Sequence, residues 1–490
     1  MSKSSTGISG IAVYVPPFRV NLQEWCAWSG EDWGKIRDVV GTGFRLPGPQ
    51  HSVYTMAANA ILRLIEQYDI DPGTVRFLGL GTESSTDNSA GAVIAKGMVD
   101  DALRQQGKAP LSRNCEVPEF KHACLGGIYA VKNAVRFLNT DGNDSKAIVV
   151  CSDVALYARG SSGEPTQGAG AVAMLIERDP QLARINLAES GSASDYRLVD
   201  FRKPMQTRDA NGNGHARYSG EIPVFNGRYS AACYVDEMLY ALEDMYDRRR
   251  ISAEDYFQKV AAVFMHRPFR RMPENALGIA YLFSLGADSA AGHQQLKSYC
   301  DAAGVSLAAV LGEMRDRPQL AALGVRERIR EEPLPLITQV HRVARQQPDY
   351  QQAVLAKMRL GLKPMEELGN LYTGALPAWL ASGLEEAAVS GELSADQEIL
   401  LIGYGSGDAA EAIPVHLVDG WEQAAGRMRV RDAMANAINL TKDQYVALRE
   451  GKPMIGLDYQ PSAEFIVDHV GSMHEDDFQD TGIEYYRFIN

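Results

Sequence analysis

The chain has 490 residues, 45% of them hydrophobic and 23% charged, so it can bury a large core as an ordinary globular protein. Its 49 Lys and Arg residues against 62 Asp and Glu residues give a net charge of −13, which argues against broad binding to nucleic acid or anionic membranes. This net charge does not exclude a local basic patch. No basic leader and no run of about 18 apolar residues occurs, so we expect a soluble cytoplasmic protein without a membrane span.

In the first part of the chain, short apolar runs alternate with longer helical patterns, which predicts layers of mixed α/β structure. Apolar residues recur at helical spacing over residues 51–68. VRFLGLGTE at 75–83 is typical of a buried strand that carries Glu83 at its C-terminal end. After Cys124 the helical spacing returns, so this thiol is predicted at or just before a helix N-terminus.

The same order of elements returns near the other end of the chain. KAIVVCSD at 146–153 predicts a strand, and TQGAGAVAMLIE at 166–177 predicts a glycine loop that leads into another strand. Later, residues 370–384 predict a helix, 398–407 a strand with a glycine loop, and 411–418 a strand. This order indicates an internal duplication, although no residue-by-residue identity accompanies it.

Two further segments lie between these parts. Residues from about 285 to 365 are rich in Arg, Glu and Gln with helical patterning, which we interpret as a helical elaboration on the core. Residues 259–283 predict a buried strand that ends in His266, then a proline-containing loop and an apolar helix. An imidazole at a strand end suits hydrogen bonding or proton transfer, and a purely structural histidine remains the alternative.

Cys124 is the candidate nucleophile. At a helix N-terminus the free N–H groups and the helix dipole favour thiolate, lowering a pKa that is about 8.5 in free cysteine, and they point at an oxyanion on an attached acyl group. Gly126 and Gly127 remove bulk where a substrate must approach. A buried inert thiol is the alternative. Glu83 is a candidate buried base with a raised pKa, or else a helix-capping acid.

The other cysteines have no CxxC spacing and no Cys/His ligand pattern, which argues against a zinc site and against a disulfide scaffold. We therefore expect the thiols to be free, and we expect no metal site. The residues concerned are Cys26, Cys115, Cys151, Cys233 and Cys300.

Seven motifs appear in the order found in hydroxymethylglutaryl-CoA synthases, which the chain resembles over nearly its whole length. The motifs are TES at 82–84 with Asp87, KHACLGG at 121–127, SDVALY at 152–157, PTQGAGAVAML at 165–175, FMHRPF at 264–269, GNLYTG at 369–374 and GYGSG at 403–407. The resemblance implies the five-layered αβαβα fold of the thiolase superfamily, with two duplicated halves and a homodimer. The halves would span residues 1–180 and 181–425, and 426–490 would complete the fold.

The resemblance also implies an activity, the condensation of acetyl-CoA with acetoacetyl-CoA to 3-hydroxy-3-methylglutaryl-CoA, as in mevalonate supply for isoprenoids. Cys124 would carry the acetyl group, Glu83 would remove a methyl proton, and His266 would orient the acceptor's 3-keto oxygen. CoA thioesters would be substrates, with no cofactor. Further site residues are implied by motif position: Asn370, Ser406, Asp153 and Tyr372 at the acyl groups, and Arg271, Arg270 and Arg267 at CoA or phosphopantetheine.

One departure from the family pattern and several alternatives accompany this prediction. Asn226 replaces the family aspartate of the DGxYS segment, which puts that residue's support of catalysis in doubt. A carrier protein in place of CoA, as in polyketide β-branching, stays open, and so does a non-catalytic thiolase-fold partner subunit. A ketoacyl synthase is disfavoured, because FMHRPF and the glutamate at 83 do not fit its Cys-His-Asn set.

Overall fold

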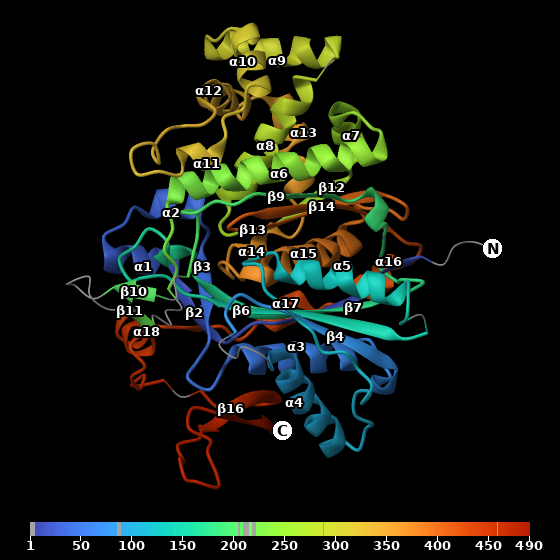
Figure 1. Ribbon diagram of the computed structural model, residues 1–490, viewed down its shortest axis with the longest axis vertical. Coiled ribbons are helices and arrows are strands. Elements are labelled where there is room, and N and C mark those ends of the chain that lie inside the picture. Colours follow the sequence, from blue (N-terminus) through green and yellow to red (C-terminus); the bar gives the residue numbers. More distant parts are fainter. Residues whose placement is uncertain are drawn as a thin grey trace.

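The computed structural model describes residues 5–85, 90–142, 144–203, 206–208, 215–217, 222–287, 289–457 and 459–490. Its elements lie in five layers, in which layers of helices alternate with layers of strands (Figure 1). Helices α3 and α4 cover one outer face, α5 and α15 lie in the middle, and α6 and α8 cover the other face. This arrangement confirms the predicted αβαβα fold. The six helices are α3 (Val53–Gln67), α4 (Gly91–Gln105), α5 (Gly126–Leu138), α15 (Ala375–Ser390), α6 (Gly227–Arg249) and α8 (Arg271–Leu285).

The strands of both layers are hydrogen-bonded into one sheet of order β12-β13-β14-β8-β1-β7-β6-β4-β5, with β9 paired to β14. The short strand β8 joins the two layers because it pairs with β14 on one side and with β1 on the other. The strands are β1 (Thr6–Tyr14), β4 (Val75–Gly81), β5 (Glu119–Phe120), β6 (Lys146–Ala155), β7 (Gly168–Arg178), β8 (Ala183–Ile185), β9 (Gly191–Ser194), β12 (Ala262–Met265), β13 (Glu398–Gly405) and β14 (Ala409–Leu417).

The two layers of strands repeat one pattern. Strand β4 runs parallel to β6, and β6 runs antiparallel to β7; in the same way β12 runs parallel to β13, and β13 antiparallel to β14. The middle-layer helices α5 and α15 precede β6 and β13, respectively. This repeat confirms the predicted duplication. The strand predicted within 166–177 is present as β7, but it already begins at Gly168, so the glycines expected in a loop before it are part of the strand. A Cβ atom at Gly168 would collide with the backbone of Asn370.

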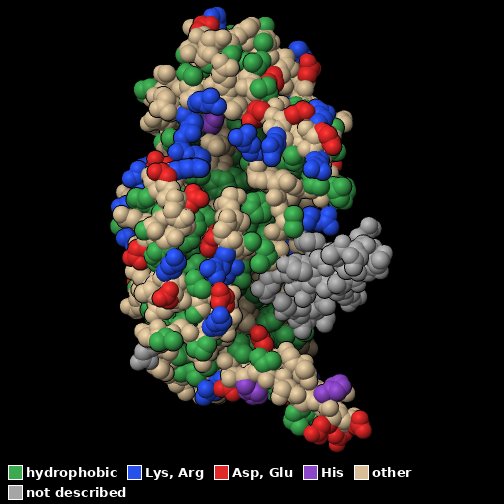
Figure 2. All heavy atoms as spheres, turned by 90° about the vertical axis from the view of Figure 1, so that its left-hand side faces the viewer, with side chains coloured by type: hydrophobic (Ala, Val, Ile, Leu, Met, Phe, Trp, Pro, Cys, Tyr) green, Lys and Arg blue, Asp and Glu red, His purple; other side chains and the backbone are tan. Residues whose placement is uncertain are grey.

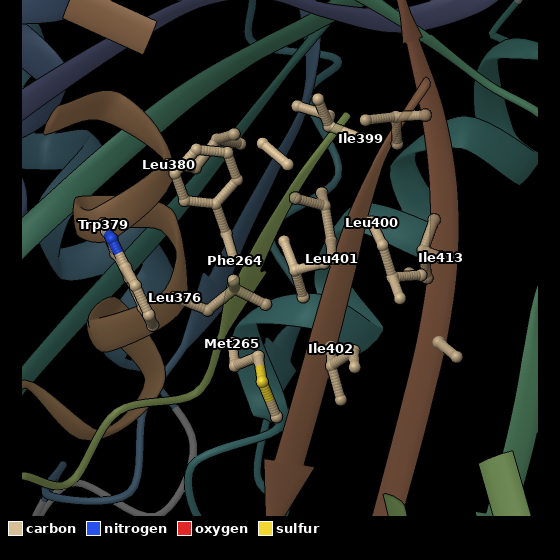
Figure 3. Close-up of a cluster of buried hydrophobic side chains, with 14 of the residues drawn as sticks. Phe264, Met265, Leu376, Trp379, Leu380, Ile399, Leu400, Leu401, Ile402 and Ile413 are labelled. Carbon is tan, nitrogen blue, oxygen red and sulfur yellow. The ribbon is translucent and has the colours of Figure 1, made fainter. Parts of the chain in front are cut away.

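The core of the second half fixes the strand that leads to His266. Figure 3 shows Phe264 and Met265 of β12 between side chains of α15 and of β13. The rings of Phe264 and Trp379 meet edge-on with their centroids 6.0 Å apart. Burial of each such large side chain contributes about 1.5–3 kcal/mol. The end of β12, one residue before His266, is therefore held firmly.

A group of helices between α8 and α15 packs on the outer helical layer, at the top of Figure 1. Buried side chains of α9 and α12 belong to the same hydrophobic cluster as those of the sheet, so these helices share its core. The group comprises α9 (Ala290–Ala303), α10 (Leu307–Arg315), α11 (Leu320–Leu323), α12 (Pro335–Ala344) and α13 (Pro348–Ala353), whereas the short helix α14 (Leu362–Met365) packs beside α15 in the middle layer.

The remaining elements form smaller units at the edges of the fold. The hairpin β16–β17 near the C-terminus is tied to β1 by Glu464, which accepts a hydrogen bond from the Tyr14 hydroxyl at 2.6 Å. Within the described ranges, no helix combines the length and apolar composition that crossing a bilayer would require. The smaller elements are β2 (Phe18–Asn21), β3 (Gly43–Leu46), β10 (Gln206–Arg208), β11 (His215–Arg217), β15 (Ile438–Asn439), β16 (Glu464–Val470), β17 (Glu484–Ile489), α1 (Leu22–Ser29), α2 (Trp33–Val39), α7 (Ala253–Lys259), α16 (Trp421–Ala425), α17 (Val430–Met434) and α18 (Lys442–Arg449).

Candidate active site

A cavity of about 290 Å³ gathers residues from distant parts of the sequence. Its wall is largely aromatic and apolar, and it contains five residues that the sequence analysis singled out. Cavities of this size, lined by apolar groups with a few polar ones, are typical of small-ligand sites. The five residues are Cys124, His266, Asn370, Tyr372 and Ser406, and the aromatic wall includes Tyr157, Phe201, Phe225, Phe269 and Tyr404.

Cys124 lies two residues before α5, as predicted. Its Sγ atom is 3.5 Å from Oε2 of Glu83, which follows strand β4. Packing as well as substrate access requires glycine at position 127, because a Cβ atom on Gly127 would lie 2.2 Å from Sγ of Cys151. The close packing of α5 on the sheet therefore places the thiol beside the carboxyl group.

The pKa of the Cys124 thiol lies well above its usual value. Burial is the main cause, and the carboxyl groups of Glu83 and Asp153 raise it further, while Lys203 opposes them. The expectation of a lowered pKa at this helix N-terminus is therefore wrong. The helix dipole acts on a buried thiol that faces two acids, and these effects outweigh it. In this site the neutral thiol is the resting form.

Burial raises the pKa of Glu83 to about 7, which confirms the predicted raised pKa. Lys203 opposes this rise, since its Nζ atom lies 3.4 Å from Oε1 of Glu83. The same ammonium group lies 4.9 Å from the ring centroid of Tyr372. A carboxyl group with a pKa near 7 exchanges protons readily at neutral pH.

Asp153 is fully buried and is held by protein groups alone. Its Oδ1 atom accepts hydrogen bonds from the backbone N–H groups of Glu83 and Ser84 at 2.7 and 2.9 Å, and Oδ2 accepts one from the N–H group of Thr373 at 3.0 Å. Asp153 does not line the cavity. It joins the turn that carries Glu83 to the segment that carries Tyr372, which is a positioning role.

His266 follows β12 directly, and its ring lines the cavity. The residue is 2% exposed, and burial lowers the pKa of its imidazole to about 3, so the ring is neutral. The hydroxyl of Tyr234 donates a hydrogen bond to its backbone oxygen at 2.8 Å. Its Nδ1 atom has no hydrogen-bond partner among the described residues. A neutral imidazole can donate one ring N–H to an oxygen of a bound molecule.

The other predicted site residues divide into those inside the cavity and those near its border. The side-chain oxygen of Asn370 accepts a hydrogen bond from the N–H group of Tyr372 at 2.8 Å, which fixes both residues in the wall. Ser406 lies in the turn after β13. Asp87, part of the first motif, lies outside the described residues.

The three arginines after His266 differ in their surroundings. Arg267 is 3% exposed, burial lowers its pKa to about 10, and its guanidinium lies over the ring of Trp379. Arg270 and Arg271 are partly exposed, and each forms an ion pair with Glu274. They lie between the cavity residues Phe269 and Met272 in the sequence, but neither of them lines the cavity. On the face in Figure 2, Lys and Arg side chains gather around a hollow.

All six cysteines are free, as predicted, and four of them are buried. Across the part of the chain that the structure describes, no group of three or more His, Cys, Asp or Glu side chains is placed to hold a metal ion.

The comparisons with known proteins agree with this geometry. Residues 2–181 match the family model described as hydroxymethylglutaryl-coenzyme A synthase N terminal. The hydroxymethylglutaryl-CoA synthase of Haloferax volcanii is 26% identical, with 96% of this chain and 98% of that protein covered. The enzyme of the same name from Enterococcus faecalis is 25% identical, with 90% and 91% covered. The chain is thus similar to hydroxymethylglutaryl-CoA synthases along nearly its whole length, and its N-terminal part matches the model of that family.

Solved hydroxymethylglutaryl-CoA synthases have the same fold. One is MvaS in complex with 3-hydroxy-3-methylglutaryl coenzyme A, with a TM-score of 0.75, 23% identity and full coverage of both chains. Another is the synthase of the curacin biosynthetic pathway in complex with an acetyl donor-ACP, with a TM-score of 0.70, 18% identity, and 99% and 100% of the two chains covered. The predicted thiolase-like fold is confirmed.

One site residue, Lys203, escaped the sequence analysis, and the structure also shows what Asn226 contacts. Lys203 belongs to a segment without clear periodicity, and only its contact with Glu83 in three dimensions reveals it. Asn226, which replaces the family aspartate, donates a hydrogen bond from Nδ2 to the backbone oxygen of Val199 at 2.6 Å. A carboxylate cannot donate this bond, so Asn226 anchors the neighbouring segment in a way that aspartate would not.

Proposed function

We propose that the protein condenses acetyl-CoA with acetoacetyl-CoA to 3-hydroxy-3-methylglutaryl-CoA through an acetyl group carried on Cys124. The observation that carries this proposal is the 3.5 Å contact between the Cys124 thiol and the Glu83 carboxyl group, at the cavity that also holds His266. A thiol nucleophile, a base of matched pKa and a neutral donor are the groups that such a condensation requires.

The first step is transfer of the acetyl group. As the sulfur of Cys124 attacks the carbonyl carbon of acetyl-CoA, its proton passes to the Glu83 carboxylate, which accepts from the thiol in the resting site. The C–S bond to CoA breaks, and the CoA sulfur takes the proton from Glu83, so CoA leaves as a thiol and Glu83 returns to the carboxylate form. Because the resting thiol is neutral, this base accelerates formation of the thiolate.

The second step is formation of the carbon–carbon bond. Glu83 removes a proton from the methyl group of acetyl-Cys124, and the resulting carbon nucleophile attacks C3 of the acetoacetyl thioester. His266 orients the 3-keto oxygen through its ring N–H, and protonated Glu83 returns its proton to the new alkoxide. Water then hydrolyses the thioester to Cys124, which frees the thiol and leaves the product's carboxylate.

The remaining polar groups would hold the acyl groups. We assign hydrogen bonds to the substrates to Asn370 and to Ser406, and we assign the oxyanion hole to the backbone N–H groups of Cys124 and Ser406. Tyr372 would form part of the wall, and Asp153 would keep Glu83 in place. Preorganised donors of this kind commonly contribute a large part of the acceleration of acyl transfer.

Arg270 and Arg271 are the cations that we assign to the phosphates of CoA, because both are partly exposed and both lie in the sequence between the cavity residues Phe269 and Met272. Arg267 is buried against Trp379 and does not suit a phosphate in solvent. The same two cations suit the phosphate of a carrier-bound phosphopantetheine arm. The acceptor's carrier therefore has to be decided by experiment.

The test begins with labelled acetyl-CoA and locates the label by mass spectrometry of peptides. Acetoacetyl-CoA and acetoacetyl-carrier protein are then offered in parallel. We expect label on Cys124 and product from acetoacetyl-CoA. Product from the carrier substrate alone would favour the β-branching alternative, and label on any other residue would refute the mechanism.

Two variants and a matched control separate the steps. Cys124→Ser is expected to abolish both label and product. Glu83→Ala is expected to retain acetyl transfer, at a reduced rate, and to abolish condensation, because the thiol can lose its proton to solvent whereas the methyl group requires a positioned base. Cys115→Ser changes a thiol outside the cavity and should behave as the wild type. Normal condensation by Glu83→Ala would refute the role of Glu83.

The proposal extends to the state of the protein in solution. We expect a homodimer that works in the cytoplasm on thioester substrates without a cofactor. Light scattering of the purified protein measures its oligomeric state. Unchanged activity after dialysis against a chelator tests whether the enzyme works without a cofactor.

A further inference from the structure

Behind His266, two buried carboxyl groups face the hydroxyl of a cavity residue. Tyr404, on strand β13, lines the cavity, and its hydroxyl lies 2.8 Å from Oδ1 of Asp408 and 3.2 Å from Oδ2 of Asp200. The two aspartates are 2% and 1% exposed. Neither of them was singled out in the sequence.

The ring of Tyr404 connects this pair to the imidazole. It stacks on His266 with the ring centroids 6.3 Å apart and the planes 27° apart, while Tyr234 meets it edge-on at 4.7 Å. The backbone N–H group of His266 also donates to the oxygen of Ile402, two residues before Tyr404 on β13, at 2.8 Å. Movement of the Tyr404 ring would therefore move the surface on which the imidazole rests.

The charged groups around Asp200 and Asp408 explain how the two carboxyl groups can be buried side by side. Arg197 is 2% exposed, and its Nε atom lies 3.7 Å from Oδ2 of Asp408, but it also pairs with Asp195 and Asp236. One shared cation does not neutralise both carboxyl groups. Burial, the charge of Asp200 and a hydrogen bond to Asp200 raise the pKa of Asp408 to about 9, so Asp408 carries a proton at neutral pH.

We propose that the buried carboxyl groups of Asp200 and Asp408, through the Tyr404 hydroxyl, fix Tyr404 as a positioning residue for His266 in the condensation step. This inference rests on the proposed function. Burying two carboxyl groups costs free energy compared with apolar packing, and buried ionisable groups of this kind are concentrated at functional sites. Because His266 orients only the acetoacetyl acceptor, loss of the pair should affect condensation more than acetyl transfer.

The test compares two substitutions of one residue. Asp408→Asn keeps a carbonyl oxygen for Tyr404 and an N–H donor for Asp200, so it reproduces the protonated acid. Asp408→Ala removes both. We expect single-turnover condensation by the acetylated enzyme to fall about 10- to 100-fold in Asp408→Ala, and to stay within about threefold of the wild type in Asp408→Asn. Acetyl transfer to Cys124 should remain within about threefold in both variants.

A third variant tests the path through the tyrosine. Tyr404→Phe keeps the ring but loses the hydroxyl, so it should slow condensation about as much as Asp408→Ala, and the double variant should be no slower than either. Full condensation by Asp408→Ala, equal losses in the Asn and Ala variants, or additive losses in the double variant would overturn the inference. So would a parallel loss of acetyl transfer, which indicates a general structural role. Failure of the wild type to condense would instead overturn the proposed function.

Discussion

At Gly81, at the end of β4, the addition of a single methyl group should displace the nucleophile Cys124. A Cβ atom there would lie 2.4 Å from the Cα atom and 2.5 Å from the backbone nitrogen of Gly127, in the first turn of α5. Both contacts are with backbone, so no side-chain rotation can relieve them. Because carbon atoms pack at about 3.5 Å, Gly81→Ala must push α5 away from the strand by about 1 Å.

The expected effects follow from that displacement. Overpacking of a tight core costs about 1–3 kcal/mol, so the free energy of unfolding should fall by that amount. Cys124 precedes α5 by two residues and should move with it, and a misplacement of about 1 Å can slow a reaction about 100-fold. The rate of acetyl-Cys124 formation, followed by mass spectrometry, and the midpoint of chemical unfolding measure the two effects.

Gly97, in the exposed face of α4, provides the matched control. A Cβ atom there meets no other atom within 4 Å. Gly97→Ala should therefore stabilise the protein by about 0.5–1 kcal/mol, through the helix propensity of alanine, and leave acetyl transfer unchanged. Wild-type acetylation and stability in Gly81→Ala would refute the argument that glycine packing between β4 and α5 sets the position of the thiol.

Three other predictions concern the groups around Glu83. Condensation by acetylated enzyme should rise with pH through about 7, because only the carboxylate form of Glu83, whose pKa burial raises to about 7, can take the methyl proton. Lys203→Met removes a cation that lies 3.4 Å from Glu83 and favours its charged form, so the rise should move to higher pH in rapid-quench assays. Thr373→Val removes the hydroxyl donor to buried Asp153 and should lower the free energy of unfolding in urea by about 1–3 kcal/mol.

The controls for these predictions are exposed residues of the same type. Lys108→Met should leave the pH profile unchanged, and Thr140→Val should change the free energy of unfolding by less than about 0.5 kcal/mol. A profile that is flat around pH 7, or that moves to lower pH in Lys203→Met, would contradict the assignment of Glu83 as the base. Equal stability of Thr373→Val and Thr140→Val would show that Asp153 does not depend on Thr373.

Local patterns in the chain were enough to predict many of the helices and strands, whereas their arrangement in five layers was implied by the resemblance. Apolar spacing placed α3, α5, α15 and their strands, because burial of one face is written into the order of residues along each element. The apolar patterns around Cys124, Glu83 and His266 placed them at ends of elements, and the structure has them there. The domain boundaries near residues 180 and 425 stay predictions.

What the sequence alone determined is which groups stand at the ends of which elements, since a chain's local pattern specifies its helices and strands. The tertiary structure decided how those groups affect one another. It turned the expected low pKa of Cys124 into a raised one, because burial beside Glu83 and Asp153 outweighs a helix dipole. It also brought Lys203 to Glu83 and set Asp200 and Asp408 behind Tyr404. Coulomb energy and desolvation depend on distances through space, and separation along the chain does not give those distances.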